Sequence, residues 1–477
     1  MAEYDLVVVG LGAGGRTAAE FAAGLGLRVA AVERARPGGS SLWTGSVPSK
    51  AIVASANVAH TMRTAHRLGI TAVKPVIDLA TVWRRTRAVQ AEIAAADGPR
   101  RSTEMGVTVL FGSARLATAT SVVVTAPDGS EQVLDTKFVL LCTGSRPALP
   151  RIEGLDPERC LTSDNLFVQD APPPSLAIIG GGPLGTEMAQ ALHRLGVTIT
   201  LFERLPMLLA GEEPALVERL TDALVAEGVR IHCSADIRAI DHHPDGTATV
   251  QAITGDVGER VTIEVGGVLV AAGRTPNVHG LGLDEAGVSY TDAGILVDDR
   301  GRTDQRTVYA AGDVTADPAI ARRLATAAAF NAVQAVRDMF FPGRSNVDRT
   351  MPWCTFTDPE LARVGLTVAE AEELHGTDAD AWQLELPRLD RARTDGCTDG
   401  SIVIVTAKSR IVGAHVLAPG AGEIIHELAL AVREGLRVDE LAGLVHTYPT
   451  YASGVGQLAV DAAFEKAQRL KWMIKKR

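Results

Sequence analysis

Aromatic side chains, paired cysteines and long apolar runs are all scarce in this chain of 477 residues. Aromatic residues make up only 4% of it, and its cysteines form no CxxC pair. Most of the cysteines fall in apolar, strand-like runs, where a small buried thiol is the ordinary interpretation. The cysteines are Cys142, Cys160, Cys233, Cys354 and Cys397. This pattern gives no sign of an oxidising compartment, and we expect no metal site.

Clustered positive charge and membrane-spanning length are missing as well. The formal net charge is −10, which disfavours nucleic acid as a partner because phosphate binding depends on clustered Lys and Arg. No uninterrupted apolar run reaches about 18 residues, the length that would suggest a membrane span. The first apolar strand, YDLVVVG, starts almost at Met1 and leaves no room for a signal peptide. We therefore expect a cytoplasmic protein with no membrane partner.

Glycine is abundant, and it falls in a repeated pattern. The 47 glycines suit an α/β protein with many tight turns between strands and helices, and at roughly 100 to 200 residues per domain the length predicts about three domains. Residues 4–33 and 176–203 each have the order strand, glycine-rich turn, helix and second strand ending in an acid. The GxGxxG positions are Gly10, Gly12 and Gly15 in the first stretch and Gly180, Gly182 and Gly185 in the second. Two dinucleotide sites are predicted, with Glu33 and Glu203 placed to bind a ribose diol.

Several motifs together resemble one family, the FAD-dependent pyridine nucleotide-disulfide oxidoreductases, over essentially the whole chain. They are GLGAGG, GGSSLWTGSVPSK, TGSRP, GGGPLGTE, AAGRTPN, YAAGDV, FTDPELARVG and HTYPT. The resemblance implies an α/β fold with two Rossmann-like dinucleotide-binding domains, for FAD and NAD(P), and a C-terminal α+β dimerisation domain. It assigns residues 1–150 and 276–345 to the FAD domain, 151–275 to the NAD(P) domain and 346–477 to the dimerisation domain, with a linker near 341–351. A homodimer is expected on this likeness alone.

The resemblance also assigns roles to individual residues. FAD would be held by Gly10, Gly12, Gly15, Glu33, Thr143, Gly144 and Asp313, and the nicotinamide cofactor by Gly180, Gly182, Gly185, Glu203 and Gly273. Lys50 and Glu187 match the ion pair that this family places beside the flavin N5, where a lysine stabilises negative charge on the reduced ring. Glu203 favours NADH because its carboxylate repels a 2′-phosphate, although the adjacent Arg204 leaves contact with such a phosphate open.

Two departures from the family pattern concern the disulfide chemistry itself. Ser41 and Ser46 stand where disulfide reductases have their two redox cysteines, and a serine hydroxyl forms neither a disulfide nor a thiolate. In the C-terminal motif, Tyr448 replaces the histidine base and Ser453 replaces the glutamate that orients it. Tyrosine has a reference pKa of about 10, so Tyr448 is expected to donate a hydrogen bond to a carbonyl or quinone oxygen rather than accept a proton. His446 is interpreted as a packed structural residue.

These observations predict an FAD-dependent NAD(P)H dehydrogenase. NADH, the preferred donor, would reduce the flavin, and the flavin would pass electrons directly to a small acceptor such as a quinone, with Ser41, Ser46 and Tyr448 shaping the acceptor side. A soluble NAD(P)+ transhydrogenase is the close alternative. A non-catalytic, NADH-sensing flavoprotein that acts as a binding partner is the alternative from another class. Disulfide reductase activity is not expected, because it would need a reactive thiol near the flavin.

The basic C-terminal stretch FEKAQRLKWMIKKR leaves two interpretations open. Its apolar side chains recur at helical spacing, which is compatible with docking on an anionic surface. We favour a helix end that packs on a second copy of the chain.

Overall fold

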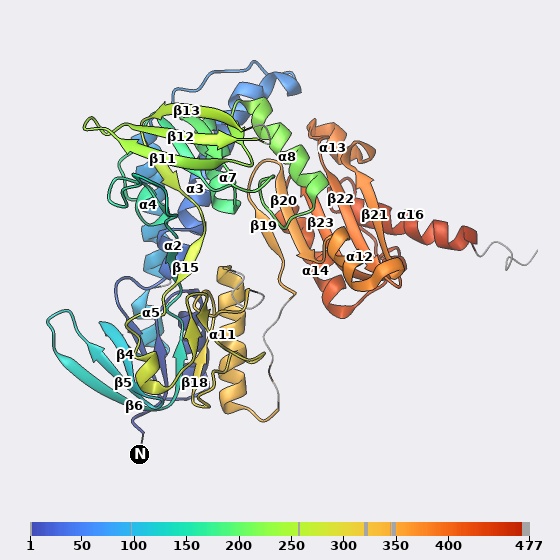
Figure 1. The fold of residues 1–477 in the computed structure, drawn as a ribbon. Coiled ribbons are helices and arrows are strands. Elements are labelled where there is room, and N and C mark those ends of the chain that lie inside the picture. The colour runs from blue at the N-terminus through green and yellow to red at the C-terminus, as the bar shows by residue number, and fades with distance from the viewer. Residues whose placement is uncertain are drawn as a thin grey trace, which may run out of the picture.

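The computed structural model describes residues 2–96, 98–255, 258–318, 323–343, 345 and 350–469. Figure 1 shows three units, two of them built around parallel sheets and the third around the sheet that carries β19 to β23. This arrangement confirms the predicted mixed α/β fold with a separate C-terminal α+β unit. The domain boundaries stay a prediction, and the expected linker falls partly on residues 344 and 346–349, which lie outside the described residues.

The first unit is a parallel sheet built from the two ends of the FAD segment. Its parallel strands run in the order β3, β2, β1, β6, β18, and the pair β4 and β5 extends β6 in antiparallel fashion. The bounds are β1 (Tyr4–Val9), β2 (Val29–Glu33), β3 (Val107–Phe111), β4 (Ser113–Thr118), β5 (Ser121–Thr125), β6 (Glu131–Leu141) and β18 (Val308–Ala310). The short strand β18 brings the segment after the second unit back to this sheet.

Small side chains let helices cover this sheet closely. Helix α1 (Ala13–Gly24) buries Ala18, Ala19 and Ala22 and packs against α11 (Ala325–Phe340). Because β1 is buried on both faces, its residues Leu6 to Val9 are all apolar, as expected for a central parallel strand. Helices α2 (Gly39–Trp43), α3 (Ser46–Thr64), α4 (Leu79–Ala96) and α5 (Pro99–Glu104) follow β2.

The second unit repeats this plan. Its parallel strands lie in the order β10, β9, β8, β14, and a three-stranded antiparallel sheet, β11 to β13, lies beside them. The bounds are β8 (Ser175–Ile179), α7 (Pro183–Arg194), β9 (Thr198–Phe202), α8 (Pro214–Glu227), β10 (Arg230–His232), β11 (Asp236–His242), β12 (Ala248–Thr254), β13 (Glu259–Val265) and β14 (Val268–Val270). Helix α7 packs against α3, so the two units meet helix to helix.

The chain crosses between these two units through a short antiparallel pair. Strand β7 (Ser145–Pro147) leads out of the first sheet, and β15 (Arg274–Pro276) pairs with it on the way back. The two crossings therefore lie side by side, next to both glycine-rich turns.

The third unit is an antiparallel sheet with helices, in the order β19, β20, β23, β22, β21. The bounds are β19 (Trp353–Thr355), β20 (Glu360–Gly365), α12 (Val368–His375), β21 (Ala379–Glu385), α13 (Asp390–Asp395), β22 (Ser401–Ala407), β23 (Arg410–Ala418), α14 (Ala421–Glu434), α15 (Val438–Leu441) and α16 (Ser453–Arg469). Helix α8 of the second unit lies against β20 and β23 (Figure 1). The last part of the basic C-terminal stretch, residues 470–477, lies outside the described residues. Within the described part of the chain, no helix is long and apolar enough to cross a membrane.

Candidate active site

A single cleft of about 1960 Å³ runs between the units and contains most of the residues predicted from the sequence. The predicted residues that line it are Gly10, Gly12, Glu33, Ser41, Ser46, Lys50, Thr143, Gly144, Gly180, Gly182, Glu187, Glu203, Gly273 and Asp313. Both glycine-rich turns and both strand-end carboxylates therefore open into one space. Gly15 and Gly185 lie behind their turns, and Tyr448 lies elsewhere.

The first glycine-rich turn packs its backbone so closely that two of its positions accept only glycine. Gly10 has a φ of +96°, and a Cβ on it would lie 2.5 Å from the Cys142 carbonyl oxygen. A Cβ on Gly15 would lie 1.8 Å from the Gly10 carbonyl oxygen, so the start of α1 approaches its own turn too closely for any other residue. The N-terminus of α1 consequently faces the cleft, which is the arrangement that binds a pyrophosphate.

The second turn has the same backbone arrangement and is more open. Gly180 has a φ of +108°, and a Cβ on Gly185 would lie 1.9 Å from the Gly180 carbonyl oxygen. No heavy atom lies within 4 Å of a Cβ built on Gly182, whereas one on Gly12 would already lie 3.7 Å from Gly39. Both turns fit a dinucleotide phosphate, and the second is less covered.

The two acids that end β2 and β9 are each held by backbone N–H groups. Glu33 accepts hydrogen bonds from the N–H of Leu11 at 2.9 Å and of Ala35 at 2.8 Å, one on each carboxylate oxygen. Glu203 accepts from Gly181 at 2.6 Å and from Leu205 at 2.8 Å. Each carboxylate is therefore fixed in orientation, and its remaining lone pairs are available to ribose hydroxyl groups.

Lys50 and Glu187, which are 137 residues apart, form the ion pair that the sequence predicted. Lys50 Nζ lies 2.7 Å from Glu187 Oε2, and the Glu187 side chain is only 4% exposed. The other oxygen of Glu187 accepts from the Phe356 backbone N–H at 2.9 Å, and Lys50 Nζ lies 4.4 Å from the centre of the Phe356 ring. Helices from the first two units supply the pair, and the third unit supplies the group that fixes it.

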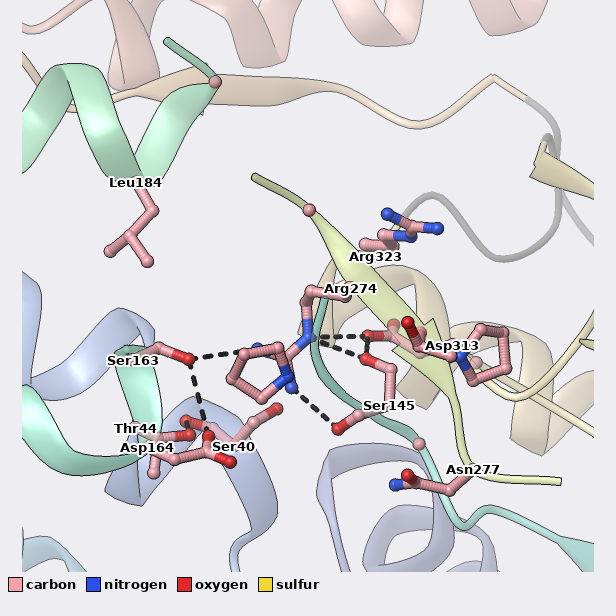
Figure 2. A pocket seen from close by; sticks show the side chains of 18 of the residues that line it. Ser40, Thr44, Ser145, Ser163, Asp164, Leu184, Arg274, Asn277, Asp313 and Arg323 are labelled. Atoms are coloured by element: carbon pink, nitrogen blue, oxygen red, sulfur yellow. Dashed lines mark hydrogen bonds and ion pairs between the residues drawn. The ribbon is translucent and has the colours of Figure 1, made fainter. Parts of the chain in front are cut away.

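Asp313 lies in a small polar cluster that the sequence only partly revealed (Figure 2). Its Oδ2 accepts a hydrogen bond from Ser145 Oγ at 2.6 Å and lies 3.7 Å from Arg274 Nε. Arg274 also donates to Ser145 Oγ at 2.6 Å, to the Ser145 carbonyl at 2.7 Å and to Ser163 Oγ at 3.3 Å. Arg274 belongs to the AAGRTPN motif, yet the motif alone did not single it out. Its guanidinium therefore links β15, which carries Arg274, to β7, which carries Ser145, next to Asp313.

The segment that would carry a redox disulfide carries hydroxyl groups instead. Ser41 is partly buried and Ser46 is exposed, and both line the cleft. Hydrogen bonds fix the backbone between them, because the buried side-chain amide of Gln90 donates to the carbonyls of Leu42 and Trp43, each at 2.9 Å. The two serines therefore flank a backbone segment that is fixed in place.

Two cysteines that are far in sequence from Ser41, Ser46 and Tyr448 do reach the cleft. Cys142 lies behind Gly10, and Cys354 lies near the Lys50 and Glu187 pair. Burial raises the pKa of Cys142 to about 12. Burial, with the nearby carboxylate of Glu360, raises the pKa of Cys354 far above its usual range. All five cysteines are free, and protonated thiols such as these two are poor nucleophiles. Among the residues that the structure describes, no cluster of His, Cys, Asp and Glu could hold a metal ion.

Tyr448 is not brought to the cleft of its own chain. Its side chain is 71% exposed on the third unit, and its hydroxyl donates to Asp390 Oδ2 at 2.7 Å, which raises the pKa of the phenol. Ser453 donates to the Thr450 carbonyl and plays no part in orienting Tyr448. His446 is packed at the same end of the unit, with its Nε2 atom 3.0 Å from Glu427.

Comparison with protein families gives two matches that together span most of the chain. Residues 4–335 match the model described as pyridine nucleotide-disulphide oxidoreductase. Residues 351–459 match the model of the dimerisation domain that accompanies it.

Individual relatives are similar over nearly their full lengths. A mercuric reductase of Streptomyces lividans is 34% identical over 95% of this chain and 94% of its own. A dihydrolipoyl dehydrogenase of Chlorobaculum tepidum is 31% identical over 97% of each chain. Among solved structures, the HOCl-induced flavoprotein disulfide reductase RclA from Escherichia coli superposes with a TM-score of 0.81 over 96% of this chain and 99% of its own. Its 24% identity supports a common fold only.

Proposed function

Because the chain belongs to the pyridine nucleotide-disulphide oxidoreductase family, we propose that it passes electrons from NADH through FAD directly to a small acceptor such as a quinone, with no sulfur relay. The coarser activity follows from membership: the chain is an FAD-dependent oxidoreductase that uses NAD(P)H as its electron donor. The finer statement concerns the acceptor and the route that the electrons take to it.

The chain's own residues fit the two cofactors. Gly10 and Gly12 lead into the start of α1 with no side chains of their own, and Glu33 presents fixed carboxylate oxygens nearby. The same groups recur at Gly180, Gly182 and Glu203 for the nicotinamide nucleotide. When bound, FAD supplies a ring that accepts a hydride from the nicotinamide and gives up two electrons to an acceptor.

Lys50 is the residue that we expect to stabilise the reduced state. Its ammonium group is half-buried and lies 2.7 Å from the buried Glu187 carboxylate, and a cation fixed in this way is worth more than a freely solvated one. The Glu187 carboxylate holds this ammonium group in the cleft. The role of the pair is therefore to lower the energy of negative charge that develops in the cleft.

The single observation that carries the proposal is the absence of reactive sulfur from the cleft. By the family resemblance, Ser41 and Ser46 stand in place of the cysteine pair. The thiols that line the cleft, Cys142 and Cys354, have pKa values raised by burial and stay protonated. A disulfide relay needs a thiolate that attacks sulfur. Direct transfer to the acceptor is the route that remains.

A preference for NADH is supported by the geometry of Glu203. Both of its oxygens accept from backbone N–H groups, so the carboxylate cannot swing away from an approaching 2′-phosphate. Arg204 lines the same part of the cleft and is the residue that would favour NADPH. We propose that the fixed Glu203 carboxylate outweighs the adjacent, exposed cation of Arg204.

A homodimer is part of the proposal. The third unit exposes several large apolar side chains, which an interface between two copies would cover. These side chains are Leu430, Leu444, Val445, Val460 and Phe464, of which Val445 is 94% exposed. Because Tyr448 lies outside its own cleft, it can shape an acceptor site only in the cleft of a second copy. A cytoplasmic location is also proposed, and the five free cysteines support it.

The proposal is tested by turnover of the purified holoprotein with a panel of oxidants, using NADH and NADPH in parallel. Rapid reduction of quinones with NADH, and little turnover of NADP+, oxidised glutathione or lipoamide, is the expected result. Rapid NADP+ reduction would show a transhydrogenase. Flavin reduction without turnover on any oxidant would indicate an NADH sensor, and brisk disulfide reduction would contradict the absence of a sulfur relay.

A further inference from the structure

One face of α7 carries three buried polar side chains, Glu187, Gln190 and Arg194. They are three and four residues apart, so they lie above one another on the same side of the helix. Each of the three residues is only 3% exposed. Burying charged and amide groups is unfavourable unless each is hydrogen-bonded, so their partners matter.

Arg194 joins all three units through four acceptor groups. It forms a two-pronged pair with Glu227, the last residue of α8, with Nε and Nη2 at 2.7 and 2.6 Å from the two carboxylate oxygens. Its Nη1 donates to Asp358 Oδ2 at 2.9 Å and to Asn57 Oδ1 at 2.7 Å. Nη2 also lies 3.4 Å from the Asp358 carbonyl oxygen. The segment ahead of β20 is thereby tied to α7, α8 and α3 at one point.

Gln190 pairs with the backbone of the same segment. Its Oε1 accepts from the Asp358 N–H at 2.8 Å, and its Nε2 donates to the Asp358 carbonyl at 2.8 Å. Nε2 also donates to Glu227 Oε1 at 2.9 Å. This pairing fixes both the position and the direction of the backbone at Asp358.

Phe356, two residues before Asp358 in the same segment, contacts both members of the Lys50 and Glu187 pair. The Phe356 N–H donates to Glu187 Oε1, and the Phe356 ring lies under Lys50 Nζ. Glu187 therefore has one oxygen occupied by Phe356 and the other by Lys50. If the segment moved away from α7, the occupied oxygen would be released, and the carboxylate could rotate away from Lys50.

We propose that Gln190 and Arg194 are positioning residues for the Lys50 and Glu187 pair. They hold residues 356–358 against α7, and this segment in turn holds the Glu187 carboxylate in the orientation that places the Lys50 ammonium group in the cleft. The proposal rests on the function proposed above for that pair, but it concerns only reduction by NADH, which precedes any acceptor.

The test measures the reductive half-reaction of holoprotein carrying Gln190→Met or Arg194→Lys. Rapid-mixing experiments without oxygen give the limiting rate of flavin reduction and the Kd for NADH separately. In each variant the limiting rate should fall about tenfold or more, while the Kd for NADH and the FAD content stay within about twofold, because only the orientation of the pair has changed. Gln190→Met leaves no unpaired charge, and Arg194→Lys keeps the charge but loses the two-pronged pairing.

The matched control is Arg219→Lys. Arg219 lies on α8 and, like Arg194, binds the third unit, but it does so through Glu385 of β21, with Nη1 at 2.6 Å from Glu385 Oε2, rather than through residues 356–358. Its limiting rate should equal that of the wild type. Unchanged rates in both test variants, or a fall in rate matched by equal losses of NADH affinity and FAD content, would overturn the proposal. An equal fall in the control would overturn it too. Protein that NADH reduces but that turns over no quinone would contradict only the proposed acceptor, and would leave these rates interpretable.

Discussion

The two glycine-rich units have nearly the same backbone but use their helices differently. Each turn begins with a glycine of positive φ, and each has a later glycine whose Cβ would lie 1.8 or 1.9 Å from a carbonyl oxygen. In each unit, a glutamate at the end of the second strand is held by two backbone N–H groups. The helices differ: α1 buries alanines, whereas α7 buries a charged and amide face.

This difference matches two kinds of cofactor binding. A Cβ on Gly14 of the first unit would lie 2.9 Å from the Ala328 carbonyl, so α11 closes over the start of α1. The corresponding position of the second unit is Leu184, whose side chain lines the cleft, and a Cβ built on Gly182 meets no heavy atom within 4 Å. A closed turn suits a cofactor that stays bound, and an open one suits a cofactor that exchanges. Because α7 must also position Glu187, its inner face cannot be made of alanine alone.

The largest effect is expected from the glycines that face their own turns. Gly15→Ala puts a Cβ 1.8 Å from a backbone oxygen and should prevent isolation of yellow holoprotein, since the clash exceeds what side-chain adjustment relieves. Gly185→Ala should retain FAD but weaken NADH binding at least about 100-fold, which corresponds to about 3 kcal/mol. FAD absorbance and NADH titration measure both. Gly24→Ala, whose Cβ meets nothing within 4 Å, is the control. Equal FAD loss in the Gly15 and Gly185 variants would erase the proposed difference between the units.

Removing the cation that α7 positions should affect rate rather than binding. Lys50→Met should slow flavin reduction by about 10² to 10³-fold, the usual cost of losing one preorganised electrostatic group, with the Kd for NADH nearly unchanged. Lys137→Met removes an ion pair of the first unit, 2.9 Å from Asp5, and should leave the rate unaltered. A change in Kd with an unchanged limiting rate would move Lys50 from the reaction to nucleotide binding.

A buried histidine of the third unit should make the folded protein less stable at low pH, so the two turns are best compared near neutral pH. His415 is fully buried on β23 between Arg363 and Glu370, and burial lowers its pKa from 6.5 to about 4. Between these pH values, His415 is therefore protonated in the unfolded chain and neutral in the folded chain. Stability should be complete above pH 6.5 and fall by up to about 3 kcal/mol as the pH drops toward 4. Urea midpoints from pH 4 to 8 measure this fall, and His415→Gln should flatten the profile between those limits. An equally steep profile in that variant would assign the acid sensitivity elsewhere.

The smallest effect is expected from the paired glutamates. Glu203→Gln should raise the KM for NADH about tenfold, because the amide has only one oxygen to accept from the two backbone N–H groups. The KM values for NADPH and NADH should also become more similar, because the amide does not repel a 2′-phosphate. Glu33→Gln should weaken FAD retention and leave the KM for NADH alone. Parallel NADH and NADPH kinetics of both variants give the comparison. An NADPH preference in the wild type would show that Arg204 outweighs Glu203.

Sequence reasoning reached the parts of the site that depend on local geometry. The turns and the strand-end acids follow from short motifs, because chain direction and glycine conformation place them. The Lys50 and Glu187 pair joins segments that are 137 residues apart, and it was predicted only through the family resemblance. The residues that it missed depend on contacts between distant segments. Cys354, Phe356 and Arg274 enter the cleft only when the units pack together.

One missed feature did leave a signal. Glu187, Gln190 and Arg194 share one face of a predicted helix. Both faces of this helix are buried, and recognising this would have shown that the three polar side chains need buried partners. The place of Tyr448 left no such signal, since its side chain lies on the surface of the third unit, bound to Asp390.

The most direct test of direct electron transfer is an anaerobic titration of the holoprotein with NADH, followed by absorbance. Without a sulfur relay, the flavin should be fully reduced by one NADH, taking up two electrons, with no long-wavelength thiolate band. Uptake of four electrons per flavin, or the appearance of that band, would contradict the account.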